Sequence, residues 1–219
     1  MVRQACLATM MMRKEEGGRR REEGAVKEVE APQEGRASSR QGGFEAAAVT
    51  SIQAGKKENR LKWFSMAIQE NPDVAAYHGN LGNAFRDLGR LEDAVESYQK
   101  TLSLKPDFLE AHNNLGVALK ELGRLEEAVA SFRAALAIKP DYFKAHINLG
   151  NALLKMMLYE DAEASYRAAL AVRPDSCNAH LWLANALRRQ NRREDAVASC
   201  RAALALAPDR AEAHSSLGT

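Results

Sequence analysis

The sequence predicts an all-α protein, an α-solenoid built from antiparallel helix pairs that stack one after another. Two residue types recur with a spacing of 34 residues along most of the chain. The histidines are His78, His112, His146, His180 and His214, and the prolines are Pro72, Pro106, Pro140, Pro174 and Pro208. A constant period of this length indicates a tandem array whose unit is a pair of helices. Aromatic residues make up 6% of the chain and alanine is abundant, which favours close helix packing over strands.

The first 74 residues are expected to differ from the rest. Residues 1–40 predict a disordered tail, because mixed charges with Gly, Ser and Pro bury too little apolar surface to fold. Residues 41–74 keep the repeat register but have Arg60 where the later repeats have Ala. They therefore predict a degenerate repeat that caps the N-terminal end of the array.

Four complete repeats follow, and each is predicted to hold two helices. They span 75–108, 109–142, 143–176 and 177–210. First helices are expected at about 75–88, 109–122, 143–156 and 177–190, and second helices at about 92–104, 126–138, 160–172 and 194–206. Proline at repeat position 32 stops each second helix, because it lacks an amide hydrogen. The aspartate after each proline is expected to accept amide hydrogens at the start of the next helix.

Small residues predict where the two helices of a repeat touch. Position 8 is Gly82, Gly116, Gly150 and Ala184, and position 20 is Ala94, Ala128, Ala162 and Ala196. The turns between helices differ in quality: Gly89 and Gly123 suit a left-handed backbone and Asn191 tolerates it. Met157 does not, so its turn is predicted to be the least favourable of the four.

Residues 211–219 begin a fifth repeat that stops after its ninth residue. An array buries its last apolar face only with a capping element. This end therefore predicts either a piece of a longer protein or self-association through the uncapped end.

Composition narrows the classes of function. A formal net charge of +2 gives no reason to expect nucleic acid or an anionic membrane as a partner, and no apolar run reaches the roughly 20 residues that span a bilayer. Three cysteines without a CxxC pair fit neither a disulfide framework nor a zinc site, so we expect an intracellular protein of the cytoplasm or the nucleus. The sequence predicts no metal, no cofactor and no catalytic group, and hence no enzyme.

The histidines are interpreted as structural. A single metal ion needs imidazole nitrogens at about 2.0–2.1 Å, whereas equivalent helices of adjacent repeats lie about 8–10 Å apart. We expect partly buried rings that bridge neighbouring helices, with protonation near pH 6 loosening the stack.

The Leu, Gly, Ala and Pro positions are similar to those of tetratricopeptide repeats over most of the chain. The segments AHNNLG and LGRLEEAVASFRAALAIKPDY most resemble the superhelical repeats of O-linked N-acetylglucosamine transferases. The resemblance implies a right-handed superhelix whose position-6 asparagines form a ladder along the concave face and bind the backbone of an extended polypeptide. Here those residues are Asn80, Asn114 and Asn148, whereas the fourth repeat has Trp182.

The candidate peptide-binding residues extend this row. They are Asn80, Asn83, Asn114, Lys120, Lys144, Asn148, Asn151, Trp182, Asn185 and Arg188. Amides donate and accept hydrogen bonds, so an asparagine row can bind any extended backbone. Alternatively, each asparagine pairs with the adjacent repeat, the charges form a solvated face, and Trp182 packs on the next repeat, including Leu217.

The sequence thus predicts a scaffold or adaptor that holds an extended protein or peptide segment in a concave groove. The alternative is the substrate-recognition arm of an O-linked N-acetylglucosamine transferase whose catalytic domain lies beyond Thr219.

Overall fold

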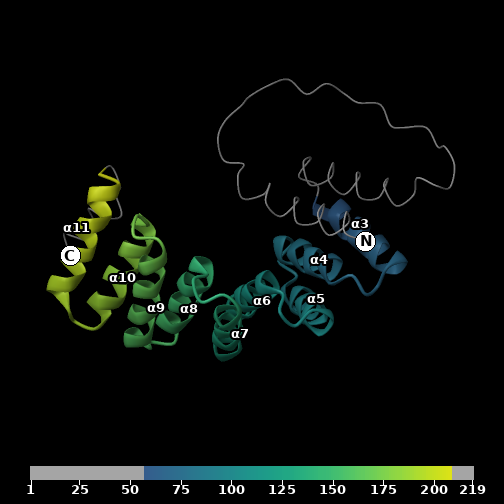
Figure 1. The fold of residues 1–219 in the computed structure, drawn as a ribbon, viewed down its shortest axis with the longest axis horizontal. Coiled ribbons are helices and arrows are strands. Elements are labelled where there is room, and N and C mark those ends of the chain that lie inside the picture. Colours follow the sequence, from purple (N-terminus) through teal and green to yellow (C-terminus); the bar gives the residue numbers. More distant parts are fainter. Residues whose placement is uncertain (1–56, 209–219) are drawn as a thin grey trace, which may run out of the picture.

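The computed structural model describes residues 57–208, which form nine α-helices and no strand (Figure 1). The helices are α3 (Lys57–Glu70), α4 (Ala75–Asp87), α5 (Leu91–Leu104), α6 (Leu109–Glu121), α7 (Leu125–Ile138), α8 (Phe143–Lys155), α9 (Tyr159–Val172), α10 (Cys177–Arg189) and α11 (Arg193–Leu206). Each helix from α4 to α11 begins and ends within one residue of its expected range. The predicted tail, the first part of the degenerate repeat and the start of a fifth repeat lie outside the described residues.

The helices stack in chain order as an α-solenoid forming a right-handed superhelix, which confirms the predicted fold class. Four hairpins form its body: α4 with α5, α6 with α7, α8 with α9, and α10 with α11. Each second helix also packs against the first helix of the next hairpin, and α3 packs on α4. First helices of adjacent hairpins contact one another as well, which places α4, α6, α8 and α10 along the inner, concave side.

An aromatic ring on each of three second helices lies directly over a glycine of the first helix. A Cβ atom added to Gly82 would lie 2.7 Å from the ring of Tyr98. At Gly116 the distance to Phe132 would be 2.6 Å, and at Gly150 the distance to the Tyr166 ring would be 2.5 Å. These separations leave no room for a side chain, so glycine sets how closely the two helices approach.

The fourth hairpin uses the same contact with the sizes exchanged. It has Ala184 at the glycine position and Cys200 at the aromatic position, and both are buried. A larger residue on the first helix is thus matched by a smaller one on the second. The close approach predicted from the small residues is confirmed, and the ring against the glycine is its physical cause.

The histidines bind the turn that precedes their own helix. Nε2 of His78 lies 2.8 Å from the Pro72 carbonyl oxygen, and Nε2 of His112 lies 2.7 Å from that of Pro106. His146 and His180 make the same contact at 2.8 and 3.0 Å, with Pro140 and Pro174. The hydrogen bond of each ring is therefore made to a backbone carbonyl six residues earlier and not, as expected, to a neighbouring helix. This contact explains why histidine and proline share one spacing.

Aspartate does not cap the first helices, contrary to the sequence prediction. The cap position is Val74, Phe108 or Tyr142 in the first three hairpins, and none of these side chains accepts a cap hydrogen bond. In the fourth, Ser176 accepts a hydrogen bond from the amide of Ala179. The aspartate falls one residue too early, inside the turn that follows proline.

Arg60 of the degenerate repeat lies against the array. Its guanidinium donates a hydrogen bond to Asp87 of α4 at 2.7 Å, and only 14% of its side chain is exposed. The position that holds alanine in later repeats therefore carries an ion pair between α3 and α4.

The turns inside the hairpins all use a left-handed residue. Gly89 and Gly123 have φ of +75° and +82°, and Met157 and Asn191 have φ of 61°. Left-handed backbone costs an L-residue about 1–2 kcal/mol, and Asn relieves part of this cost by local hydrogen bonding. Met157 is 72% exposed, so little packing offsets the strain.

Replacing Gly116 by alanine is expected to lower the free energy of unfolding by about 1–3 kcal/mol, because the new Cβ meets the Phe132 ring. Combining it with Phe132→Cys, which copies the fourth hairpin, should cost less than the sum of the two single changes. Urea denaturation of the unchanged protein, the two single variants and the double variant measures this coupling free energy. Gly79→Ala is the control, since its Cβ would lie 3.6 Å from Thr101, and it should not destabilise. Strict additivity would contradict the size matching.

Replacing Met157 by glycine is expected to raise the free energy of unfolding by about 1 kcal/mol, because it removes left-handed strain at an exposed site. Asn191→Gly should give a smaller gain, and Gly123→Met should give a loss. Thermal and urea unfolding measure all three. A loss of stability in Met157→Gly would show that the methionine side chain contributes more than the strain costs.

Candidate functional site

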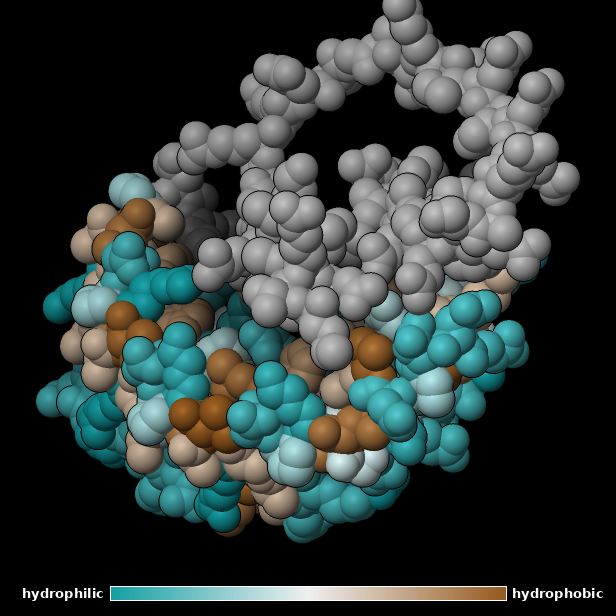
Figure 2. All heavy atoms as spheres, turned by 45° about the vertical axis from the view of Figure 1, so that its right-hand side comes forward, coloured by the Kyte–Doolittle hydropathy of each residue, from teal (hydrophilic) through white to brown (hydrophobic). Residues whose placement is uncertain are grey.

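The candidate site is the inner surface formed by α4, α6, α8 and α10, and every residue proposed from the sequence lies on one of these helices. On the face shown in Figure 2, small hydrophobic areas are separated by hydrophilic ones.

Four asparagines form a continuous chain of side-chain hydrogen bonds across three first helices. Nδ2 of Asn148 on α8 donates to Oδ1 of Asn113 on α6 at 3.0 Å. Nδ2 of Asn113 donates to Oδ1 of Asn114 at 3.3 Å, and Nδ2 of Asn114 donates to Oδ1 of Asn83 on α4 at 3.1 Å. The bonds all run in the same direction, from α8 toward α4. We call these four residues the asparagine chain.

Core tyrosines hold two asparagines at repeat position 9. The hydroxyl of Tyr98 donates to Oδ1 of Asn83 at 2.7 Å, and the hydroxyl of Tyr166 donates to Oδ1 of Asn151 at 2.8 Å. Burial raises the pKa of both tyrosines, which keeps them as neutral donors. In the second repeat both members of this polar pair are replaced by apolar residues. Val117 stands in place of the asparagine, and Phe132, which has no hydroxyl, stands in place of the tyrosine.

The sequence analysis left open whether asparagines pair with the adjacent repeat, and Asn114 and Asn148 do so. It did not single out Asn113, which connects them. These paired asparagines can still form further hydrogen bonds with a ligand, because a primary amide has two N–H donors and two acceptor lone pairs. Asn80 makes no hydrogen bond within the described part of the chain, and Asn185 accepts one from Arg188 at 3.5 Å.

Trp182 packs on the preceding repeat. Its ring stacks on Tyr166, with centroids 6.3 Å apart and an interplanar angle of 29°. The packing that the sequence suggested was toward the following repeat, where Leu217 lies outside the described residues. The tryptophan remains partly exposed, because repeat position 6 faces the inner surface.

The candidate lysines differ in their surroundings. Lys144, near the start of α8, is exposed, whereas Lys120, in the last turn of α6, is partly buried. Burial lowers the pKa of Lys120, and the ammonium of Lys155 on α8 lowers it further. Glu121, the next residue of α6, acts in the opposite direction and raises this pKa.

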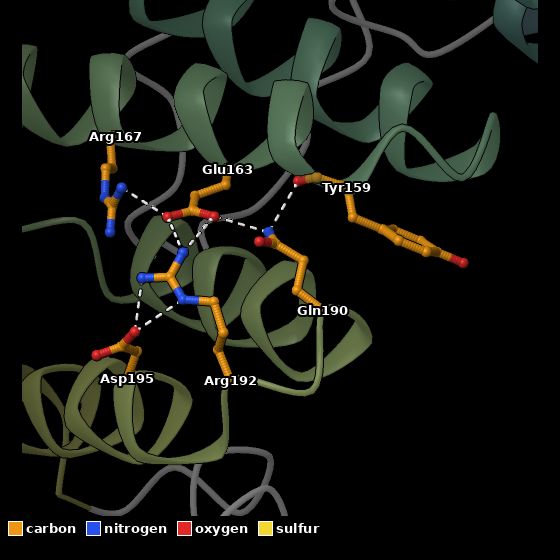
Figure 3. Close-up of polar contacts among 6 residues, drawn as sticks. All are labelled: Tyr159, Glu163, Arg167, Gln190, Arg192 and Asp195. Carbon is orange, nitrogen blue, oxygen red and sulfur yellow. Dashed lines mark hydrogen bonds and ion pairs between the residues drawn. The ribbon is translucent and has the colours of Figure 1, made fainter.

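A polar cluster that the sequence analysis missed joins the third and fourth hairpins (Figure 3). Glu163 of α9 is 5% exposed, and both of its oxygens accept hydrogen bonds from Arg192, at 2.8 and 2.9 Å. Gln190 donates to Glu163 at 2.7 Å and to the Tyr159 carbonyl at 3.2 Å, and Arg167 forms an ion pair with Glu163 at 2.6 Å.

The signal for this cluster was present at one repeat position. Position 21 is Val95, Val129 and Val197 in the other repeats but Glu163 in the third. The guanidinium of Arg192 also binds Asp195 at 2.6 Å, which fixes the turn before α11. The cluster connects adjacent repeats and lies outside the set of predicted peptide-binding residues.

Neither a membrane-spanning helix nor a cluster of metal-ligating side chains is found within residues 57–208. Within that range no helix has the length and hydropathy needed to cross a bilayer. No group of three or more His, Cys, Asp or Glu side chains there is arranged to hold a metal ion.

Sequence-family comparisons match the region that forms the hairpins. A family described as TPR repeat matches residues 82–123 and 118–156, and a family described as tetratricopeptide repeat matches residues 147–211. Together these segments cover more than half of the chain. The chain belongs to the tetratricopeptide repeat (TPR) family. A comparison with curated protein sequences finds no match.

Solved TPR structures share the fold at low sequence identity. A crystal structure of MamA is 22% identical, with a TM-score of 0.71 over 75% of this chain and 96% of that chain. MamA 41-end from Desulfovibrio magneticus RS-1 is 18% identical, with a TM-score of 0.74 over 80% and 98%. YrrB, described as a TPR protein with an unusual peptide-binding site, is 16% identical, with a TM-score of 0.70 over 83% and 96%. The predicted similarity to O-linked N-acetylglucosamine transferases gains no support from these matches and stays a prediction.

Replacing Lys155 by alanine is expected to raise the pKa of Lys120, because one of the two effects that lower it is removed. The pKa should stay below the ordinary lysine value, since burial remains. A ¹³C NMR titration of the Lys120 Cε signal measures the shift. Lys144→Ala is the matched control on the same helix and should leave the titration unchanged. An equal response to both variants would contradict the specific electrostatic effect of Lys155 on the pKa of Lys120.

Proposed function

We propose that this TPR protein is an interaction scaffold that holds an extended peptide along the inner surface of α4, α6, α8 and α10. The observation that carries the proposal is the asparagine chain, which fixes a row of amides across three repeats. Fixed amides lose little side-chain entropy on binding, so they are suited to hydrogen-bond a partner that contributes mainly its backbone.

The spacing of the repeats fits an extended partner. Packed helices lie about 8–10 Å apart, and an extended chain advances about 3.3 Å per residue. One repeat therefore corresponds to about three peptide residues. The same repeat position holds an asparagine in three successive repeats: Asn80, Asn114 and Asn148. We therefore expect successive asparagines to meet every third residue of the peptide.

The partly exposed ring of Trp182 extends this row in the fourth repeat. Its stacking on Tyr166 holds the indole in one orientation, and an aromatic ring so fixed is suited to contact an apolar peptide side chain. Among the structural relatives, YrrB is described as having a peptide-binding site, which supports the same class of function for this chain.

The test begins with a display library of random 12-residue peptides selected against the full chain. Changing Asn80, Asn114 and Asn148 together to alanine should weaken the selected peptides by about tenfold or more, since each lost hydrogen bond contributes about 1 kcal/mol. Fluorescence polarisation measures affinity, and circular dichroism verifies helicity. The matched control changes Gln99 and Arg133, exposed on second helices, to alanine.

A crosslinking measurement keeps the proposal testable if the triple variant unfolds. A photoreactive amino acid at position 144, on the inner helix α8, should crosslink the selected peptides, and the same group at position 133 of α7 should not. Crosslinking from position 133 alone would place the peptide on the outer surface and overturn the proposal.

A further inference from the structure

The hydroxyl of Tyr98 lies at one end of the asparagine chain and donates a hydrogen bond to it. Tyr98 belongs to α5 and is fully buried. Its hydroxyl and Nδ2 of Asn114 both donate to the same atom, Oδ1 of Asn83, at 2.7 and 3.1 Å. The tyrosine is thus a donor at the α4 end of a chain whose bonds all run toward α4.

This hydroxyl sets the direction of the asparagine chain. A half-turn of an amide exchanges its oxygen and its nitrogen, so half-turns of all four amides would reverse every bond. In the reversed chain, Asn83 would direct Nδ2 toward both Asn114 and the hydroxyl of Tyr98. The phenol hydrogen would then be buried without an acceptor, and a buried donor without a partner is destabilising. The observed direction is therefore the one that satisfies Tyr98.

The same arrangement leaves Asn83 with donors only. An amide oxygen has two lone pairs, and Tyr98 and Asn114 use both. Within residues 57–208, Nδ2 of Asn83 makes no hydrogen bond, and the buried side-chain polar atom without a partner is Nε of Arg60. Nδ2 of Asn83 is therefore open to solvent, and Asn83 offers a ligand two N–H groups and no acceptor.

The third repeat holds its position-9 asparagine in the same way. The hydroxyl of Tyr166, which is fully buried, donates to Oδ1 of Asn151 at 2.8 Å. In the described part of the chain, Nδ2 of Asn151 is also open and makes no hydrogen bond. The two asparagines lie two repeats apart, which corresponds to about six residues of an extended peptide.

We propose that Asn83 and Asn151 each donate a hydrogen bond to a backbone carbonyl oxygen of the bound peptide, and that Tyr98 and Tyr166 are the positioning residues that turn the N–H groups toward it. This proposal rests on the function proposed above and names the peptide group that position 9 contacts. Every residue of a peptide carries a carbonyl acceptor, so these contacts fix the register of the backbone without selecting a side chain.

The test uses peptides selected on the full chain from the 12-residue library, with one peptide bond at a time changed to a thioamide. Sulfur accepts hydrogen bonds more weakly than oxygen, whereas the thioamide N–H donates more strongly. Two positions about six residues apart should therefore bind about threefold more weakly, a part of the roughly fivefold that one hydrogen bond contributes. A scan with no weakened position would overturn the proposal.

Asn83→Asp identifies the carbonyl that faces Asn83. The carboxylate still accepts from Tyr98 and Asn114 but has no N–H to donate, so the unmodified peptide should bind about tenfold more weakly. One of the two weakened thioamide positions should become neutral in this variant. Gln99→Glu adds the same charge on a second helix and should preserve the affinity. Unchanged affinity in Asn83→Asp would contradict the proposal.

Tyr98→Phe tests the positioning role and keeps the fold. Its ring can lie against Gly82 as Phe132 lies against Gly116. Without the hydroxyl the amide of Asn83 can turn over, so the thioamide at its position should no longer weaken binding. A purely structural tyrosine would change the melting temperature and leave the thioamide response as it was, which would overturn the positioning role.

Tyr159→Phe is the matched control for the loss of a hydroxyl. Within residues 57–208 this hydroxyl makes no hydrogen bond, and the variant should preserve the thioamide response. If the selected peptides depend on Asn80, Asn114 and Asn148 but no weakened position depends on Asn83, the carbonyl contact is ruled out and the scaffold function stands. If no peptide crosslinks to the inner surface, both proposals fail.

Discussion

The contact of an aromatic ring with the backbone of the facing helix at glycine sets the geometry of three of the four hairpins. Because the ring occupies the space of a missing side chain, the separation of the two helices is fixed by the thickness of the ring. The hydroxyl of the same ring, where it exists, reaches through to the inner surface and holds an asparagine at position 9. One core contact therefore determines both the packing of the hairpin and the orientation of a polar group on the surface proposed for binding.

Much of the fold could be predicted from the sequence because the constraints repeat. A period of 34 residues, glycine at position 8 and proline at position 32 each act locally, so they place the helices within one residue. The expected aspartate caps were wrong because helix caps depend on the backbone at a single residue, and proline shifts the helix start past the aspartate. The histidine partner was a backbone carbonyl, which leaves no trace in residue type beyond the shared spacing with proline.

The helices that carry the candidate residues were predictable from the sequence, and the contacts of these residues were less so. Asparagine at one helical position of successive repeats indicated a row on one face. Whether an amide faces water or a neighbour depends on rotamers and on residues of the adjacent repeat, and Asn113 has no counterpart in the other repeats from which its role could be inferred.

The cluster around Glu163 has a consequence for how such a gene can change. Its carboxylate is buried and needs Gln190 and Arg192 of the following unit, whereas the second repeat offers Leu122 and Arg124 at the corresponding positions. A recombination event that deleted the fourth unit, or copied the second one behind the third, would leave an anion at the new junction without its amide partner. The units resemble one another closely in sequence, yet at this junction their order cannot be shuffled freely.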